Sequence, residues 1–235
     1  MSSKIRQFGL FLVVLLGFGS LTGQGASASP LTVGSTNGTL YLTGDLDGGP
    51  HMFTTAGGAV TCYEADFAAS VSVGTFGSVN ELTLQPSFPS SGTNCNAFGF
   101  FTAHVKSNGC TYTFTTPDAV KAGEVRWTAS TQFHLVCPTG KSIENTPTSF
   151  GVSVCTQFIG PQTPTASSVY GRNAGSSSFP MDVTLEYTIS GIHYTGSGGV
   201  CGNSETHSDG ITTATSTMRC YSDPGRTILT TCTFS

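Results

Sequence analysis

The chain has 235 residues and a formal net charge of −4, and only 9% of its residues are charged. This charged fraction is far below that of ordinary soluble domains, and no Lys/Arg cluster is present, which argues against nucleic acid and anionic membrane surfaces as partners. Aromatic and β-branched residues are frequent and regularly placed, which excludes a disordered chain.

Residues 1–29 predict a secretory signal peptide. Lys4 and Arg6 form a short basic start, an apolar run follows over residues 8–18, and Ala26-Ser-Ala28 is a cleavage site of the Ala-x-Ala type. The alternative is an uncleaved membrane anchor, but the apolar run is too short and too often broken by glycine for a comfortable span. We therefore expect a secreted, extracellular protein with no membrane span after cleavage.

The mature chain, residues 30–235, is expected to form a single all-β domain, because its length suits one domain. Loss of Lys4 and Arg6 changes the net charge from −4 to −6. The first candidate site in this part is Asp45-Leu-Asp47-Gly-Gly49, which is similar to the opening of a calcium loop but lacks the downstream ligands and the bidentate Glu. A Ca²⁺ ion at Asp45 and Asp47 is the one cofactor that the sequence suggests.

Alternating apolar and polar residues predict strands along most of the chain, separated by clusters of Gly, Pro, Asn and Ser. The clearest strand is Met181–Ser190, and Glu124–Val136 predicts a longer one with Trp127 on its apolar face. Other expected strands are Val79–Leu84, Phe98–Val105, Ile211–Tyr221 and a run in which Phe150, Val152, Val154 and Phe158 share a face. Residues 116–122 are the best candidate for a turn of helix. This pattern favours an antiparallel β-sandwich stapled by disulfides, with an open barrel as the alternative.

Phe100 and Phe101 break the alternation, since neighbouring residues of a strand point to opposite faces. Either both faces of the sheet are covered there, or a bulge intervenes, or one ring is exposed. An exposed ring would be the best indication of a binding surface in this chain.

The even number of cysteines in an exported chain predicts four disulfides. A zinc site is disfavoured because no Cys-x-x-Cys pair occurs. The cysteines are Cys62, Cys95, Cys110, Cys137, Cys155, Cys201, Cys220 and Cys232.

Strand register supports the pair Cys110–Cys137, because it also places Tyr112 opposite Leu135 and Phe114 opposite Phe133. A rival register, with a tight turn near Val120, would separate the two cysteines. The other expected pairs are Cys220–Cys232, which flank the turn Asp223-Pro-Gly225, and Cys62–Cys95 and Cys155–Cys201, which follow mainly from sequence order.

Several short segments in the middle two-thirds of the chain resemble a group of uncharacterised secreted, cysteine-bearing proteins of soil actinobacteria. The resemblance brings no activity, ligand or catalytic residue. It implies that the first six cysteines belong to a shared framework and that Cys220 and Cys232 are an addition. The segments are Thr61-Cys62, Cys95-Asn-Ala-Phe-Gly99, Asn108-Gly-Cys110-Thr-Tyr-Thr-Phe114, Cys137-Pro-Thr-Gly-Lys141, Gly160-Pro-Gln162 and Ser190-Gly-Ile-His-Tyr-Thr195.

Catalytic patterns are weak. No Gly-x-Ser-x-Gly elbow accompanies the five histidines. The densest polar cluster is Glu205, His207 and Asp209, in an apparent Gly/Ser-rich loop; it suits either a hydrolytic or metal-ligating loop or an ordinary solvated loop tip. The carboxylate pairs Glu64/Asp66 and Asp182/Glu186 can be explained as polar strand faces.

The sequence leaves the function unknown and favours a non-enzymatic one. We expect a secreted, disulfide-stabilised binding or structural module that acts on an extracellular ligand or a cell-surface component. The alternative is a secreted hydrolase acting on carbohydrate or ester, which should show two convergent acids in a cleft, or a His and a Ser within reach of each other.

Overall fold

The computed structural model describes the chain from residue 31 to residue 234 with gaps. The described residues are 31–33, 38–46, 49–73, 79–88, 95–115, 119–121, 124–127, 133–164, 166–173, 183–201, 204–230 and 232–234.

Within these residues the regular structure is β-strand, apart from one short 3₁₀-helix, η3 (Gly199–Cys201). The strands are β1 (Leu31–Val33), β2 (Gly38–Leu46), β3 (His51–Thr55), β4 (Gly58–Cys62), β5 (Asp66–Val73), β6 (Val79–Ser87), β7 (Cys95–Ala97), β8 (Phe101–Lys106), β9 (Thr111–Phe114), β10 (Ala119–Lys121), β11 (Glu124–Trp127), β12 (Phe133–Val136), β13 (Ile143–Ser149), β14 (Val152–Ser153), β15 (Gln157–Ile159), β16 (Ala166–Asn173), β17 (Val183–Gly196), β18 (Thr206–Tyr221) and β19 (Cys232–Phe234).

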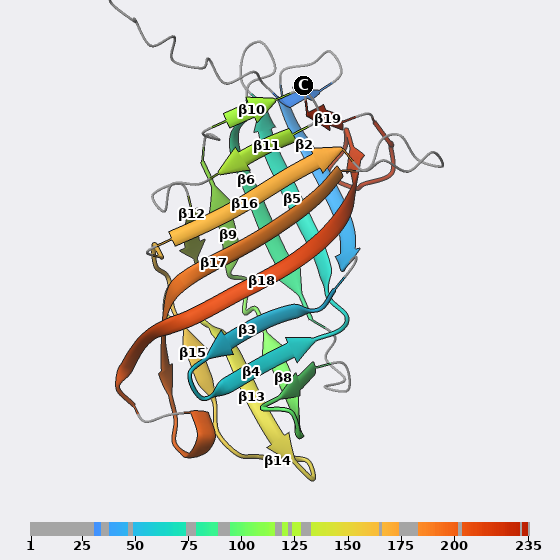
Figure 1. Cartoon of the computed structure of the whole chain (residues 1–235). Helices are drawn as coiled ribbons and strands as arrows, with labels where there is room; N and C mark the ends of the chain where they lie inside the picture. The colour runs from blue at the N-terminus through green and yellow to red at the C-terminus, as the bar shows by residue number, and fades with distance from the viewer. Residues whose placement is uncertain are drawn as a thin grey trace, which may run out of the picture.

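Eight antiparallel strands form a closed barrel in the lower half of the molecule (Figure 1). The hydrogen-bonded order is β17–β18–β3–β4–β7–β8–β13–β15, and β15 pairs again with β17. The all-β prediction is confirmed, but the predicted sandwich is wrong. Ring closure removes the two free edges that each sheet of a sandwich would have.

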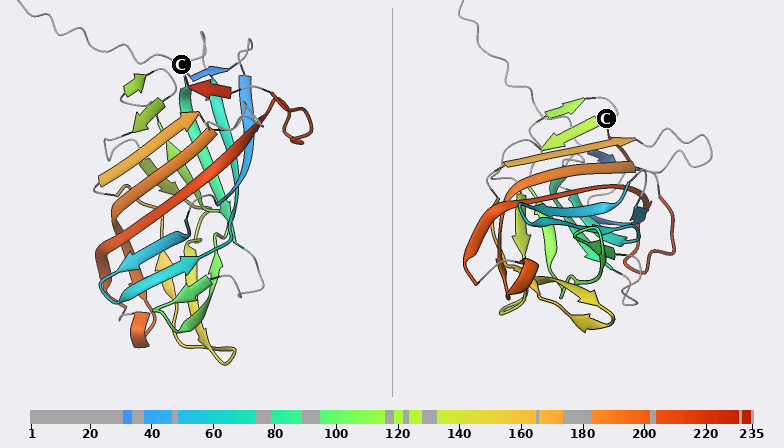
Figure 2. Two further views of the ribbon diagram at one scale, coloured as in Figure 1. Left: turned by 45° about the vertical axis from the view of Figure 1, so that its right-hand side comes forward. Right: turned by 60° about the horizontal axis from the view of Figure 1, so that its bottom comes forward.

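The upper half is a curled sheet built on the same two long strands. Here β18 pairs with β2, and the sheet continues through β5, β6 and β9 to β12. On the other side, β17 pairs with β16, which pairs with β11 and then β10. Strands β16–β18 cross in front of β5, β6 and β9, so the two arms of one sheet face each other over a common core (Figures 1 and 2).

β17 belongs to both halves because it bends at a bulge. Its register against β18 shifts between Ser190 and Ile192 and again between Ile192 and Tyr194. Gly191 has a φ of +71°, which glycine adopts without the cost that a side chain would bring. On the facing strand, a Cβ at Gly210 would come within 2.9 Å of the Phe53 ring, so glycine is needed there for close packing.

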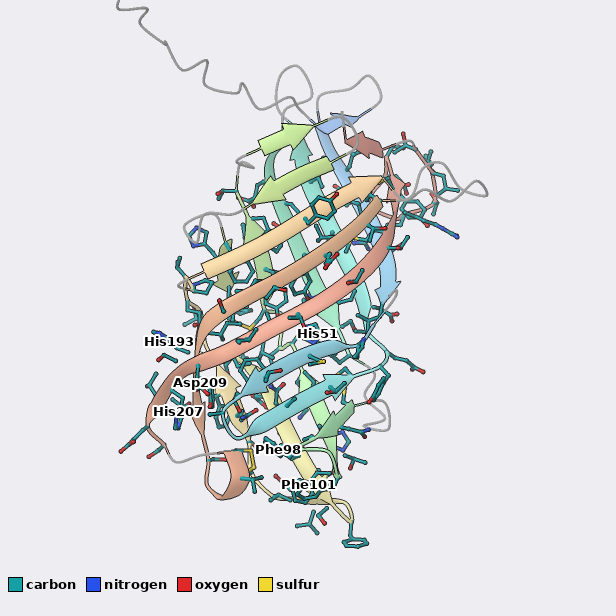
Figure 3. The ribbon with its side chains drawn as sticks, in the orientation of Figure 1. His51, Phe98, Phe101, His193, His207 and Asp209 are labelled. Carbon is teal, nitrogen blue, oxygen red and sulfur yellow. A yellow bond between two sulfur atoms is a disulfide. The ribbon has the colours of Figure 1, made fainter. Side chains whose placement is uncertain are left out.

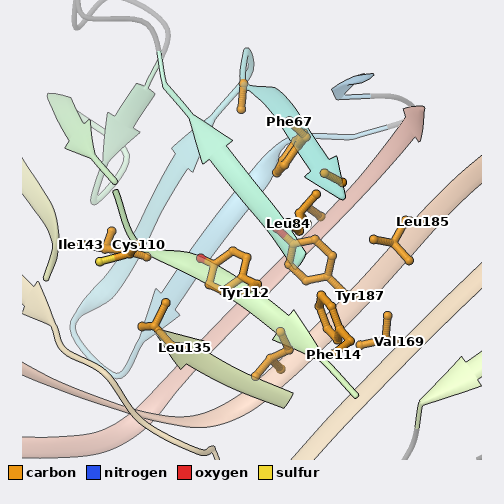
Figure 4. Packing of buried hydrophobic residues seen from close by; sticks show 14 of the residues in the cluster. Phe67, Leu84, Cys110, Tyr112, Phe114, Leu135, Ile143, Val169, Leu185 and Tyr187 are labelled. Carbon is orange, nitrogen blue, oxygen red and sulfur yellow. The ribbon is translucent and has the colours of Figure 1, made fainter. Parts of the chain in front are cut away.

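A continuous apolar core runs through both halves. Its largest fully buried side chains include Tyr187, Phe67, Phe114, Phe133 and Leu84, and Figure 4 shows several of them meeting between the arms of the curled sheet. β17 supplies this core with alternate residues, in the pattern that identified it as a strand.

The predicted register at the centre of the fold is confirmed. In the β9–β12 pair, Tyr112 lies opposite Leu135 and Phe114 opposite Phe133. The bridge Cys110–Cys137 closes this pair, and the bridges Cys62–Cys95 and Cys155–Cys201 are also as predicted. Cys220 is disulfide-bonded, whereas the side chain of Cys232 lies outside the described residues, so Cys220–Cys232 stays a prediction.

Three predictions of secondary structure need correction. The run Glu124–Val136 is not one strand: β11 pairs with β16, whereas β12 pairs with β9. The expected turn of helix over residues 116–122 is wrong where the structure describes it, because Ala119–Lys121 is β10. The run from Phe150 to Phe158 is a turn followed by two short strands, β14 and β15.

Some predictions concern residues that the structure does not describe. These include the signal peptide over residues 1–29, Asp47, Asp182 and the side chains of Asp45 and Trp127.

Candidate functional site

A cavity lies inside the molecule at the junction of the barrel and the curled sheet, and we call it the junction cavity. Its volume, as the space open to water, is about 20 Å³. Its lining is mostly apolar and includes Phe53, Phe133 and Ile192. Five residues with polar side-chain groups line it: His51, Tyr112, Asn145, Gln162 and Thr212.

His51, the first residue of β3, is buried against the aromatic core beside this cavity. Its Nε2 lies 3.3 Å from Thr212 Oγ1, and its ring meets Phe88 edge-on at 5.2 Å. Burial lowers the pKa of His51 to about 4, because the charged imidazolium would lose its hydration. His51 is therefore neutral at physiological pH. Figure 3 shows it deep within the fold.

Two buried amides lie on neighbouring strands of the barrel. Asn145 on β13 lies opposite Gln157 on β15, and each is 2% exposed. The Nδ2 of Asn145 and the Oε1 of Gln157 have no hydrogen-bond partner. Unpaired buried polar atoms are uncommon and costly in folded proteins. Apolar side chains could fill these two positions without that cost, so the pair is a candidate polar site inside the barrel.

The predicted polar cluster is not in a loop. His207 and Asp209 lie in β18, and Glu205 directly precedes that strand. The Oδ1 of Asp209 accepts a hydrogen bond from the Tyr194 hydroxyl at 3.1 Å, and its Oδ2 accepts one from the Ala56 backbone N–H. The Ala56 bond is the main reason why the pKa of Asp209 is lowered.

His207 stacks on Tyr194, with ring centroids 5.0 Å apart. One oxygen of Asp209 binds the β3–β4 turn and the other binds β17. The carboxylate therefore acts as a latch that holds both of them to its own strand, β18. A groove with a volume of about 290 Å³ adjoins the cluster, and its lining includes Phe158, His193 and Thr206. None of the lining residues carries a carboxylate. This arrangement does not provide the two convergent acids that glycoside hydrolysis requires.

A third feature, which we call the apolar end, consists of Phe98, Phe100, Phe101, Phe150 and Val152. Phe98 and Phe100 lie in the turn between β7 and β8, and Phe101 begins β8. Phe150 lies in the turn between β13 and β14, and Val152 begins β14. The pairing of Thr102 with Thr148 brings the two turns to the same end of the barrel. Figure 3 shows Phe98 and Phe101 at the lower end of the molecule.

The apolar end exposes large side chains to solvent. Phe100 is 73% exposed, Val152 is 69% exposed and Phe150 is fully exposed. Phe98 and Phe101 pack against the core, and the Phe100 ring lies 4.2 Å from the Phe101 ring. The sequence identified the Phe98–Phe101 segment through its broken alternation, but Phe150 was assigned to a strand face because its neighbours alternate.

The predicted calcium ligands Asp45 and Asp47 are not tested, because Asp47 and the side chain of Asp45 lie outside the described residues. Among the described residues, no group of three or more His, Cys, Asp or Glu side chains is placed to hold an ion. Asp45 lies in β2. Glu64 and Glu186 are exposed, as expected for polar positions at strand ends and on strand faces.

Comparisons with known proteins gave no match to a family model, to a curated protein or to a solved structure. The resemblance to secreted actinobacterial proteins therefore stays a prediction. In the described parts of the chain, no helix has the length and apolarity needed to cross a membrane. The disulfides fit an extracellular protein.

Proposed function

We propose that this protein is an extracellular binding module that docks on an uncharged, apolar face of a cell-surface component through its apolar end. The observation that carries the proposal is the exposure of Phe100 and Phe150 on neighbouring turns. Exposed apolar patches on soluble proteins commonly mark interaction sites, whereas single exposed apolar residues need no explanation.

The backbone at the apolar end supports a specialised role. Phe98 and Phe150 have φ values of +54° and +49°, in the left-handed region that disfavours bulky side chains. Such conformations cost of order 1–3 kcal/mol and gather at functional sites. The Phe98 backbone N–H donates to the Ala59 carbonyl at 2.7 Å, and this bond fixes the turn that presents Phe100.

The charge distribution indicates the chemistry of the partner. Neither residues 95–103 nor residues 145–160, which contain the two turns, include a charged side chain. Coulomb attraction therefore contributes little at this end, and the area of apolar surface removed from water should set the affinity. We expect binding that persists at high salt, where attraction between exposed charges is screened.

The test is co-sedimentation of the purified protein with cell-envelope fragments of the organism that produces it, at 0.05 M and about 1 M salt. The wild-type protein should sediment with the fragments at both salt concentrations. The double variant Phe100→Ser/Phe150→Ser should bind at least about tenfold more weakly, because two large apolar side chains are lost from the contact.

Tyr63→Ser is the matched control, because Tyr63 is 60% exposed but follows the end of β4 that is remote from Phe98. It should bind as the wild type does. The proposal is wrong if the wild-type protein stays in solution, if high salt releases it, or if the double variant binds normally.

A further inference from the structure

A groove with a volume of about 690 Å³ lies on the curled sheet, and we call it the sheet groove. Strands β2, β5 and β18 line it, together with Ser87 at the end of β6. Pockets of roughly 300–1,000 Å³ are typical of sites that bind small molecules. Figure 1 shows the three strands side by side in the upper half of the molecule, far from the apolar end at the bottom.

The sheet groove opens on the outer face of the sheet. Core residues such as Met218 on β18 and Phe67 on β5 alternate along their strands with less buried residues, which therefore point away from the core. The lining contains six of these outward-facing residues, which are Thr43, Asp66, Ala68, Thr217, Arg219 and Tyr221.

Small side chains leave room in the middle of the sheet groove. Arg219 on β18 lies opposite Thr43 on β2, and Thr43 lies opposite Ala68 on β5. A Cβ at Gly44 would overlap the Thr217 carbonyl, so glycine is required where β2 approaches β18. A site built on paired strands holds its side chains more precisely than a site on loops does.

Arg219 and Asp66 lie on opposite sides of the sheet groove. They are two strands and two residues apart in the register, which separates their Cα atoms by roughly 12 Å. Asp45 lies directly opposite Asp66, so the β5 side of the groove is acidic. An anion would be repelled on this side and a cation on the Arg219 side. A neutral ligand with several hydroxyl groups can instead accept from the guanidinium and donate to the carboxylate.

We propose that the sheet groove is a binding site for a neutral disaccharide. A disaccharide carries hydroxyl groups along its whole length, so it can bond Arg219 on one side and Asp66 on the other. The apolar C–H face of a sugar ring packs on Tyr221, whose ring is apolar and whose hydroxyl is polar. A guanidinium has five N–H donors, so Arg219 can hold a sugar oxygen and a protein partner at the same time. This site is separate from the apolar end and does not depend on the docking function.

The test is a titration of the disulfide-bonded protein with maltose, cellobiose and N,N′-diacetylchitobiose, followed by backbone amide chemical shifts. At least one of these disaccharides should cause saturable shift changes at Thr43, Ala68 and Arg219, and none should change the shift of Phe100. Digalacturonate and fully deacetylated chitobiose, which are similar in size but charged, should bind at least about tenfold more weakly than the best neutral probe, because each meets a charge of its own sign in the groove.

Ala68→Leu fills the middle of the sheet groove and should abolish the shift changes. Thr213→Leu is the matched control, because Thr213 also faces outward, on β18, but does not line the groove. Arg219→Gln and Asp66→Asn should each weaken binding about tenfold, because a charged hydrogen-bonding partner becomes neutral.

The variant Phe100→Ser/Phe150→Ser should bind the disaccharide as the wild type does, which separates this site from docking through the apolar end. The assignment is wrong if none of the three neutral disaccharides causes a saturable shift, or if the charged disaccharides bind as tightly. It is also wrong if folded Ala68→Leu binds normally. Should Ala68→Leu fail to fold, wild-type affinity in both Arg219→Gln and Asp66→Asn would overturn the assignment in the same way.

Discussion

The side-chain amide of Gln162 pairs with the backbone of His193 as one strand residue pairs with another. Its Nε2–H donates to the His193 carbonyl at 2.8 Å, and its Oε1 accepts from the His193 N–H at 2.6 Å. The Gln162 backbone pairs in the same way with Leu135 on β12, with N···O distances of 2.8 and 3.0 Å. One residue therefore links β12 to β17 and closes the curled sheet around its core.

We expect Gln162→Ala to destabilise the protein by about 1–3 kcal/mol, because the link between β12 and β17 loses both side-chain hydrogen bonds to His193, and the bond from Nε2 to the Gly160 carbonyl is lost as well. Urea unfolding should show a lower midpoint with an unchanged slope, and the His193 amide should exchange faster with solvent. Gln85→Ala, at an exposed position of β6, should change stability by less than about 0.5 kcal/mol. An unchanged midpoint for Gln162→Ala would show that the link between β12 and β17 holds without the side-chain amide.

His51 should make the fold sensitive to acid. Its folded pKa of about 4 lies below the usual 6.5, so the unfolded chain binds the proton more readily. The buried, neutral His51 therefore contributes to the free energy of unfolding. This contribution is complete above pH 6.5, falls as the pH drops from 6.5 to 4, and amounts to about 3 kcal/mol at most.

Unfolding by urea at pH 7, 5.5 and 4 checks this dependence. His51→Phe should flatten the curve over that window, whereas His193→Gln, a change at an exposed histidine, should leave it intact. An equally steep curve for His51→Phe would assign the acid sensitivity to another group.

Asp209→Ala should keep the fold but loosen the β3–β4 turn. The carboxylate bonds Ala56 and Tyr194 from a largely exposed position, so we expect a loss of about 1 kcal/mol. Because the pKa of Asp209 is lowered in the folded state, this contribution is present above its unfolded pKa and disappears as the pH falls through the folded value. Faster exchange of the Ala56 amide is the direct readout, and Glu205→Ala serves as the neighbouring control. Unaltered exchange at Ala56 would contradict the latch.

All eight cysteines should be oxidised in the mature protein, so intact mass should fall by eight hydrogens relative to the reduced chain. Non-reducing peptide mapping should link Cys110 to Cys137, which are 27 residues apart. Replacing both with Ala should cost about 3–4 kcal/mol through the entropy of the unfolded chain. Two or more thiols that alkylate without reduction would contradict the four-bridge framework.

The local parts of this fold could be predicted from sequence because they depend on neighbouring residues. Alternation identified β17, and the matching of Tyr112 with Leu135 fixed the β9–β12 register and its disulfide. Alternation could not separate β11 from β12, because both continue the same apolar pattern although they pair with different partners. Barrel closure was also out of reach, since it depends on the long-range pairs β3–β18 and β15–β17.

The candidate sites divide in the same way. Phe100 was identified because it breaks a local pattern, whereas no pattern in the sequence distinguishes Asn145 and Gln157 from other polar residues. Their burial appears only after eight strands have closed around them. No pattern in the sequence marks Gln162 as a link between strands, because a glutamine whose side chain pairs with a backbone looks like any other glutamine.

β18, near the C-terminal end of the chain, pairs with β2 and β3 near the other end, and it serves both the barrel and the curled sheet. Neither half can be completed until β18 is available. If the chain is exported with its N-terminal end first, as the predicted signal peptide implies, it would remain without its central strand until nearly all of it had crossed the membrane. Such pairing between distant segments makes folding slow, and β2 and β3 would lack one hydrogen-bonding neighbour for much of that time. Unpaired strand edges with few charges are prone to aggregation. Rapid formation of the disulfides that join the β4–β7 and β9–β12 pairs would therefore protect the chain before β18 is available.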